Sequence, residues 1–233
     1  MAEYVLESNE KFLNISSILL IMTYDCNLSC SYCFQNHTRN CRMAPETMYA
    51  ALDFALSSPN DNLTVNFYGG EPLLEYKMIK EAVDYCSYES DYVKNVQYVI
   101  GTNGILLTDL VLDFLIAHNF QLTISFDGIP EAQSFRSPDT FSFLNRLLDR
   151  LRIQHRDYFY RKVQIAITLI PETIVYLADS IEYFMQKSVR SISIMPVITH
   201  CHNWSNDYYS MLDTQLGRVA ATSLTHYSHG ACS

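Results

Sequence analysis

Three cysteines, Cys26, Cys30 and Cys33, form a C-x3-C-x2-C run directly after the apolar residues 18–22. Three closely spaced thiolates behind a strand make a compact pocket of soft ligands, which suits an iron–sulfur cluster or a zinc ion. A four-iron cluster with only three cysteines leaves one iron without a protein ligand, so another molecule can bind there and be activated. The run therefore predicts a metal centre at the carboxyl end of the first strand.

Two other uses of these cysteines stay open. A structural zinc ion needs a fourth ligand nearby, and the nearest candidates are His37 and Cys41. A disulfide is disfavoured, because three is an odd number and residues 1–15 lack the basic start and apolar middle of a secretory signal. We therefore expect a reducing, cytoplasmic location with free thiolates. Cys86 lies in a helical segment and is expected to be structural.

Composition limits the possible partners. The 233 residues are 48% apolar, which is enough to build a core. The chain has no uninterrupted apolar run of about 18 residues, so we do not expect it to span a membrane. With 25 acidic and 16 basic residues the net charge is −9, and no basic run is present. A nucleic-acid partner is therefore not expected.

Apolar runs of strand length alternate with segments of helical periodicity. The expected strands are 17–23, 63–68, 96–101, 121–126, 163–169 and 191–197. The expected helices are 45–57, 75–87, 108–118, 140–155, 173–187 and 205–226. This alternation predicts an α/β fold with parallel strands.

Six such units fit an open (β/α)6 partial TIM barrel better than a full eight-unit barrel, which needs about 250 residues. A doubly wound sheet is the alternative, because periodicity alone cannot separate the two folds. The unbroken apolar run at residues 18–22 predicts a first strand that is buried on both faces.

The chemistry of parallel α/β folds lies at the carboxyl ends of the strands. In this chain every distinctive polar or Gly/Pro cluster follows a predicted strand: the three cysteines, residues 69–72, residues 102–104, Ser125 with Asp127, residues 168–171 and residues 195–196. The sequence therefore predicts a single site on one face of the sheet.

The cysteine run, with Tyr32 just before its last cysteine, resembles the signature of the radical S-adenosylmethionine (radical SAM) superfamily. Residues 67–74, Phe-Tyr-Gly-Gly-Glu-Pro-Leu-Leu, resemble its second motif. The residues of this second motif are similar to those of the peptide- and protein-modifying branch. That branch includes anaerobic sulfatase maturases and makers of cross-linked ribosomal peptides. The resemblance implies a [4Fe–4S] cluster on the three cysteines, with S-adenosylmethionine (SAM) at its open iron. It also implies a low-potential electron donor such as flavodoxin or ferredoxin.

The resemblance assigns cofactor-binding roles around the first two strand ends. Tyr32 would pack near the adenine of SAM. Gly69 and Gly70 would let backbone with exposed amides approach the methionyl amino group. Glu71 would belong to that polar shell or hold the loop, and Pro72 would fix the turn.

Further roles fall on the later strand ends. Asn103 is expected to face the pocket or to shape the following turn. Ser125 is expected near the sugar or carboxylate of SAM, with Asp127 on the same side of the strand or capping the next turn. Arg136 would pair with the SAM carboxylate. Met195 would close over the adenine or fill a gap in the packing.

The chain departs from the family after the fourth strand. The family commonly has His-Asp where this chain has Gln133 and Ser134, and its Gly-x-Gly-Ser-Phe region is represented only by residues 138–141. These differences leave the substrate side of that loop unassigned. Phe34 is expected to shield the cluster, and the His-Cys-His of residues 200–202 to face the substrate or to have no role.

We expect a lead-in segment at residues 1–15, a radical SAM core at 16–229, and at 230–233 the start of a cysteine-rich extension marked by Cys232. A short enzyme with one cluster is the alternative. The expected activity is reductive SAM cleavage followed by hydrogen abstraction from a peptide or protein side chain, giving oxidation or cross-linking. The alternatives are action on a small metabolite and a non-catalytic iron–sulfur or zinc module.

Overall fold

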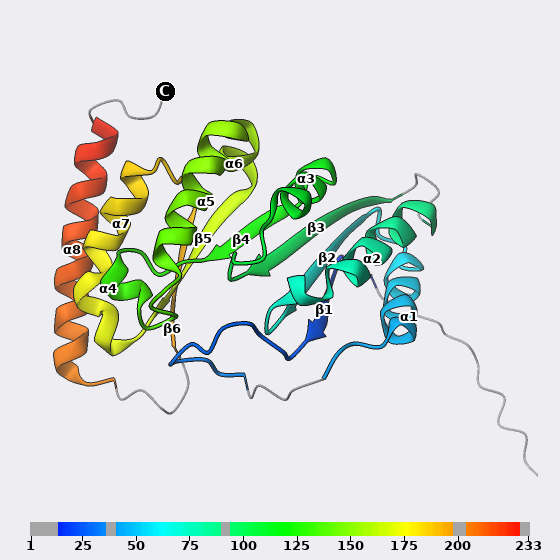
Figure 1. Cartoon of the computed structure of the whole chain (residues 1–233), viewed down its shortest axis with the longest axis horizontal. Helices are drawn as coiled ribbons and strands as arrows, with labels where there is room; N and C mark the ends of the chain where they lie inside the picture. The colour runs from blue at the N-terminus through cyan, green and yellow to red at the C-terminus, as the bar shows by residue number, and fades with distance from the viewer. Residues whose placement is uncertain (1–13, 36–40, 90–93, 198–203, 229–233) are drawn as a thin grey trace, which may run out of the picture.

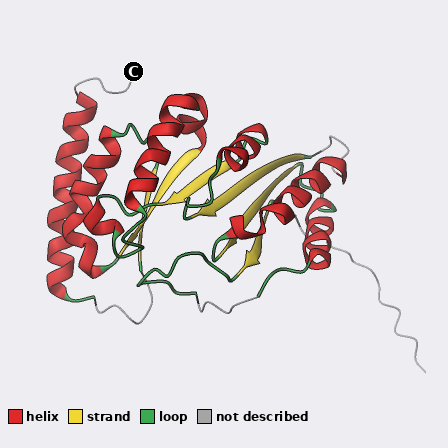
Figure 2. Ribbon diagram, in the orientation of Figure 1, coloured by secondary structure: helices red, strands yellow, loops and turns green. Residues whose placement is uncertain are grey.

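The computed structural model describes residues 14–35, 41–89, 94–197 and 204–228. It is an α/β fold built on one six-stranded sheet, with helices along its outer face (Figures 1 and 2). The strands are β1 (Ser17–Thr23), β2 (Asn62–Gly69), β3 (Asn95–Thr102), β4 (Gln121–Ser125), β5 (Val163–Leu169) and β6 (Ile192–Pro196). Each predicted strand is present, with bounds that agree to within one residue.

The α-helices are α1 (Pro45–Leu56), α2 (Tyr76–Glu89), α3 (Asp109–Ala117), α4 (Pro130–Gln133), α5 (Phe141–Gln154), α6 (Arg156–Lys162), α7 (Leu177–Gln186) and α8 (Asn206–Ser228). Two 3-10 segments, η1 (Pro72–Glu75) and η2 (Pro171–Tyr176), precede α2 and α7. The short elements α4, α6, η1 and η2 were not predicted as separate elements, because segments of one or two turns carry too few residues to show a helical period.

The order of the strands decides between the two candidate folds. All five neighbouring pairs are parallel, and the sheet runs β1-β2-β3-β4-β5-β6 in sequence order. A doubly wound sheet reverses its strand order and so places helices on both faces. An unreversed order with right-handed crossovers keeps the helices on one face and curves the sheet into part of a barrel. The predicted open (β/α)6 partial TIM barrel is therefore confirmed.

The core lies between the outer face of the sheet and the helices. On β1 the side chains of Leu20 and Met22 are buried there, whereas Leu19 on the opposite, inner face is 58% exposed. The prediction that β1 is buried on both faces is therefore wrong. A complete barrel fills its interior with side chains, but this open sheet leaves its inner face accessible.

Local sequence explains how the helices begin. Pro45 occupies the first turn of α1, where the missing N–H costs nothing. Thr108 caps α3, because its hydroxyl accepts from the backbone N–H of Val111 at 3.4 Å. No helix in the described ranges is long and apolar enough to cross a membrane.

Two glycines give a stability test of this packing. Gly217 lies inside α8 with open space around its Cα, so Gly217→Ala should stabilise the fold by about 1 kcal/mol. Gly128, just after β4, has φ +117° and a Cβ there would stand 2.1 Å from that of Ser180 on α7. We expect Gly128→Ala to destabilise the fold, as measured by urea unfolding. Equal effects of the two substitutions would contradict this packing.

Candidate cofactor site

The cysteine loop, residues 24–35 in its described part, crosses the carboxyl ends of the strands. It leaves the end of β1 and extends toward the neighbourhood of β6 (Figure 1). Its start is fixed beside residues 41–43, since Tyr24 N–H donates to the Cys41 carbonyl and Met43 N–H donates to that of Met22, both at 2.9 Å. The loop is therefore held close to the edge strand where it begins.

Gly69, the last residue of β2, and Gly70 lie against the start of this loop. The amides of Gly70 and Glu71 donate to the carbonyls of Thr23 and Asp25 at 2.8 and 2.9 Å. A Cβ at Gly69 or Gly70 would stand 2.2 Å from those same carbonyl oxygens. We predicted that these glycines expose their amides to a ligand. The structure corrects this for Gly70, because its amide is used by the protein. The close neighbour of both glycines is the backbone before Cys26.

Glu71 ties the end of β2 to the end of β3. Its Oε1 accepts from Leu73 N–H at 3.0 Å and from the Thr102 hydroxyl at 2.8 Å, and its Oε2 accepts from Asn103 N–H at 2.8 Å. Burial raises the pKa of Glu71 to about 7, although these three hydrogen bonds act in the opposite direction. Of its two predicted roles, the structure gives it the second, holding the loop. Pro72 is the first residue of η1, and it is buried.

Asn103 connects β3 to the cysteine loop. Its Nδ2 donates to Asn27 Oδ1 at 2.7 Å and lies 3.7 Å from the Sγ of Cys26. Its Oδ1 accepts from Ile105 N–H at 3.0 Å and so shapes the turn that follows the strand. The predicted shaping of the turn by Asn103 is confirmed, and its role in binding the cofactor stays a prediction.

A buried network holds the far end of the loop. Tyr32 donates its hydroxyl hydrogen to Asp127, which also forms a two-pronged ion pair with Arg136, at 3.1 Å from Nε and 2.8 Å from Nη2. Thr168 N–H of β5 donates to the same carboxylate at 2.9 Å. The Arg136 guanidinium carbon lies 5.4 Å from the centre of the Tyr32 ring. The Asp127 carboxylate therefore joins the cysteine loop, the segment that follows β4, and strand β5.

Electrostatics agrees with this arrangement. Burial alone would lower the pKa of Arg136, but the charge and hydrogen bonds of Asp127, together with Tyr32 and Cys30, outweigh burial and the pKa is raised. Burial also raises the pKa of the Tyr32 phenol. Tyr32 packs on Ile170 and Val197, at the ends of β5 and β6. The buried Asp127 is thus more than a simple turn cap, because it is paired with Arg136. The pairing of Arg136 with the SAM carboxylate stays a prediction.

Gln133 has a structural role that the sequence did not reveal. Its side chain is fully buried, its Oε1 accepts from Asp127 N–H and its Nε2 donates to the Thr140 hydroxyl, both at 2.8 Å. Gln133 occupies a position where the resembling family commonly has His-Asp. That difference was the only feature of the sequence that could have pointed to this role. Gln133 therefore holds the backbone of Asp127 through an uncharged side chain.

The three cysteines are free thiols, all half-buried in one loop. Burial raises the pKa of Cys30 to about 11, with Arg136 lowering it and the charges of Cys33 and Cys26 raising it further. The thiols are therefore close enough to repel one another as thiolates. In the described residues no three His, Cys, Asp or Glu side chains converge on a single metal ion. This donor set fits a four-iron cluster, in which each thiolate binds a different iron.

The remaining predicted residues lie around these anchors. Ser125 is half-buried at the end of β4, and Met195 on β6 is 63% exposed. Phe34 is 65% exposed and lines a cavity beside the loop. His37, residues 200–202 and Cys232 lie outside the described residues, as do the lead-in segment up to residue 13 and residues 229–233.

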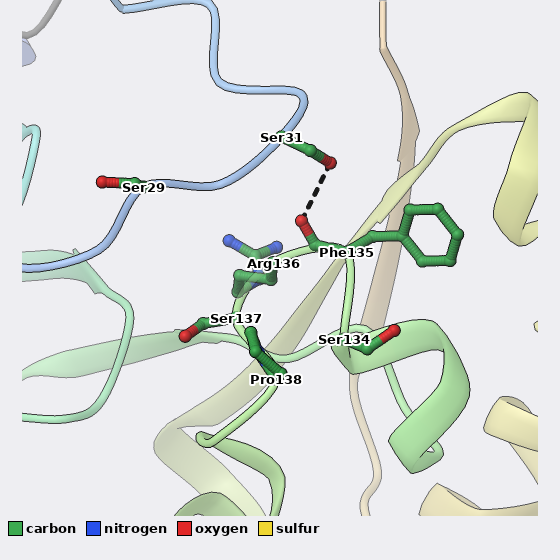
Figure 3. A pocket seen from close by; sticks show the side chains of 7 residues that line it. All are labelled: Ser29, Ser31, Ser134, Phe135, Arg136, Ser137 and Pro138. Carbon is green, nitrogen blue, oxygen red and sulfur yellow. Dashed lines mark hydrogen bonds between the residues drawn. The ribbon is translucent and has the colours of Figure 1, made fainter.

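An open polar cavity of about 480 Å³ lies where the cysteine loop meets the segment after β4 (Figure 3). Ser29 and Ser31 line one side, and residues 134–138 line the other. The Ser31 hydroxyl and N–H both donate to the Phe135 carbonyl, at 2.9 and 3.1 Å. This contact fixes the loop directly beside Cys30.

Asp127→Asn tests the buried network. The substitution leaves the Arg136 guanidinium buried without a carboxylate, which should lower the free energy of unfolding by about 3–5 kcal/mol. Asp179→Asn is the matched control, because Asp179 pairs with Arg218 with both side chains nearly half exposed and should cost at most about 1 kcal/mol. Comparable losses in the two variants, measured by denaturant unfolding, would contradict the assigned role.

Glu71 should make stability depend on pH. Its folded-state pKa is about 7, against 4.5 when unfolded, so the folded chain binds more protons between these values and loses stability as pH rises through them. Relative to Glu71→Gln, which does not titrate, the wild type should lose at most about 3 kcal/mol between pH 4.5 and 7. Unfolding curves across this range test it, and a constant difference between the proteins would refute it.

Comparison with known proteins shows where this site belongs. Residues 20–184 match the Radical SAM superfamily. MJ0907 of Methanocaldococcus jannaschii, an uncharacterised protein, is 30% identical over 76% of this chain and 60% of its own length. The radical SAM cyclopropyl synthase TigE of Paramaledivibacter caminithermalis is 27% identical over 57% and 31%. The cysteine-type anaerobic sulfatase-maturating enzyme of Clostridium novyi is 24% identical over 79% and 52%.

A GTP 3',8-cyclase of Clostridium acetobutylicum is 26% identical over 58% of this chain and 42% of its own length. The chain therefore spans between about a third and three fifths of the length of these relatives. Among solved structures, native anSMEcpe with bound AdoMet and the Cp18Cys peptide has a TM-score of 0.79 at 19% identity, over 93% of this chain and 61% of that one. This likeness confirms the fold. Because the superfamily match covers most of the sequence, the chain belongs to the radical SAM superfamily, whose members use SAM and a [4Fe–4S] cluster.

Proposed function

We propose that this radical SAM enzyme acts on a peptide or protein side chain, from which a hydrogen atom is removed to oxidise or cross-link it. The observation that carries the proposal is the uncharged inner face of the sheet. The six strands contain no Asp, Glu, Lys, Arg or His. A substrate lying against them would meet hydroxyl, amide and apolar groups only.

An extended peptide suits such a surface. Asn66, Gln97, Thr123, Gln164 and Ser193 supply amides and hydroxyls on successive strands, none of them fully buried. These groups both donate and accept hydrogen bonds, as the peptide backbone does. A phosphorylated metabolite would instead call for Arg or Lys side chains, which bind phosphate oxygens by charge-assisted hydrogen bonds.

The cofactors would be held at the carboxyl ends of the strands. We assign the cluster to Cys26, Cys30 and Cys33, and SAM to the space near Ser125 and Met195. When bound, the two together supply the one-electron cleavage of SAM that starts the radical reaction. The protein's part is to hold the cysteine loop, to orient SAM, and to exclude water. We propose flavodoxin or ferredoxin as the electron donor.

Some of the relatives support the peptide proposal and others support an alternative. A sulfatase-maturating enzyme is among the relatives, and anSMEcpe has been solved with a peptide bound. The second candidate is action on a small metabolite, which the similarity to GTP 3',8-cyclase favours. The uncharged strand surface argues for the first.

Cluster and SAM chemistry are tested by removing one thiolate. Cys30→Ala should lose the cluster and form no 5′-deoxyadenosine from SAM after anaerobic reconstitution and reduction, because a lost thiolate leaves one iron without its ligand. Cys86→Ala is the control, since Cys86 is buried in the core away from the loop. A Cys30→Ala protein that retains four irons and cleaves SAM would refute the assignment.

The substrate class is tested by isotope transfer. The reconstituted enzyme with SAM and reductant should transfer deuterium into 5′-deoxyadenosine from a perdeuterated protein digest. A deuterated nucleotide pool should give no transfer, because the strand face offers phosphate no cation. Transfer from the nucleotides alone would replace the peptide proposal by the small-metabolite alternative.

A further inference from the structure

An apolar cavity of about 470 Å³ lies on the inner face of β1 and β2, beside the cysteine loop. Leu19 and Ile21 of β1 and Tyr68 of β2 form one wall, and Tyr24 and Phe34 of the loop form another. In the sheet register Ile21 is the partner of Tyr68, so these side chains are direct cross-strand neighbours. The volume lies in the range of about 300–1,000 Å³ that is usual for ligand pockets.

The walls of this cavity are apolar and accessible. Leu19, Tyr24, Phe34 and Tyr68 are between 39% and 65% exposed. A contiguous group of exposed aromatic and aliphatic side chains marks an interaction site more often than scattered single residues do. Within the described part of the chain, none of the residues that line this cavity carries a carboxylate, ammonium or guanidinium group. Its occupant should therefore be uncharged where it enters the cavity.

The side chain of Gln35 adds one polar group to the lining of this apolar cavity. Its Nε2 donates to the Gly69 carbonyl at 2.8 Å, which fixes the orientation of the side-chain amide. Its Oε1 is buried and has no hydrogen-bond partner among the residues that the structure describes. A buried acceptor left in this state is energetically unfavourable, and a ligand that donates an N–H would satisfy it.

We propose that this cavity, the Tyr68 pocket, is a specificity site for an apolar side chain of the substrate peptide, with Gln35 Oε1 accepting a backbone N–H from the same residue. The apolar walls and the missing donor together describe a single amino-acid residue with a large apolar side chain. The proposal rests on the proposed function, because it names the part of a peptide that the open barrel would select.

Cys41 provides a reporter within the pocket. Its thiol is exposed and it is one of the lining residues. The experiment measures alkylation of Cys41 by iodoacetamide in the anaerobically reconstituted full chain with SAM, resolved by mass spectrometry of the peptide that carries it. N-acetyl-phenylalaninamide should slow this alkylation at least fivefold at saturation. N-acetyl-aspartamide should leave the rate unchanged, and the N-methylated phenylalanine derivative, which lacks the N–H, should protect at least threefold less well.

A pair of variants separates the pocket from a general effect of the probe. Leu19→Arg places a cation in the apolar wall and should abolish protection by N-acetyl-phenylalaninamide. Leu110→Arg is the matched control, because Leu110 is similarly exposed but lies on α3, outside the pocket. Equal protection by the phenylalanine and aspartate probes, or protection that survives Leu19→Arg, would overturn the proposal.

The same preparations test the pocket and the radical SAM reaction separately. Alkylation needs no turnover, so it reports on the pocket even if SAM cleavage fails. A protein that cleaves SAM but shows no protection of Cys41 overturns the pocket and leaves the radical SAM assignment standing. A protein that shows selective protection but cleaves no SAM keeps the pocket and overturns the proposed reaction.

Discussion

The Asp127 carboxylate is the point at which separate parts of the site meet. It accepts from Tyr32 of the cysteine loop, from Arg136 beyond α4 and from the backbone of Thr168 on β5. Such a charge is tolerable in the interior only because Arg136 neutralises it and the other donors satisfy its oxygens. The loop that carries the cysteines is therefore fixed to the far half of the sheet by one fully satisfied ion pair.

A second anchor holds the same loop at its beginning. There the absence of Cβ atoms at Gly69 and Gly70 lets the backbone of Thr23 and Asp25 approach, and Glu71 joins the ends of β2 and β3. Both ends of the loop are therefore bound by the protein itself, which restricts the positions of the three thiols. Such preorganisation reduces the entropy that ordering the loop would otherwise cost.

The open sheet determines which surface is accessible beside the cysteine loop. An unreversed strand order curves six strands into part of a barrel, and its inner face stays accessible. The residues on this face are uncharged, and next to β1 and β2 they give way to the apolar Tyr68 pocket. Hydroxyl and amide groups that would face a peptide backbone, with an apolar site for one side chain, are consistent with the peptide substrate that we propose.

The sequence by itself determined the family and the element order, because both are local in the chain. The cysteine run, the Gly-Gly-Glu-Pro segment and the six alternating apolar runs lie within short windows that spacing and periodicity can detect. Only the tertiary structure decided which groups those residues contact. The amides of Gly70 and Glu71 bind the loop from β1, and Gln133 holds Asp127. The exposure of Leu19 was likewise decided by strand order, because contacts between residues far apart in the chain depend on how the sheet is wound.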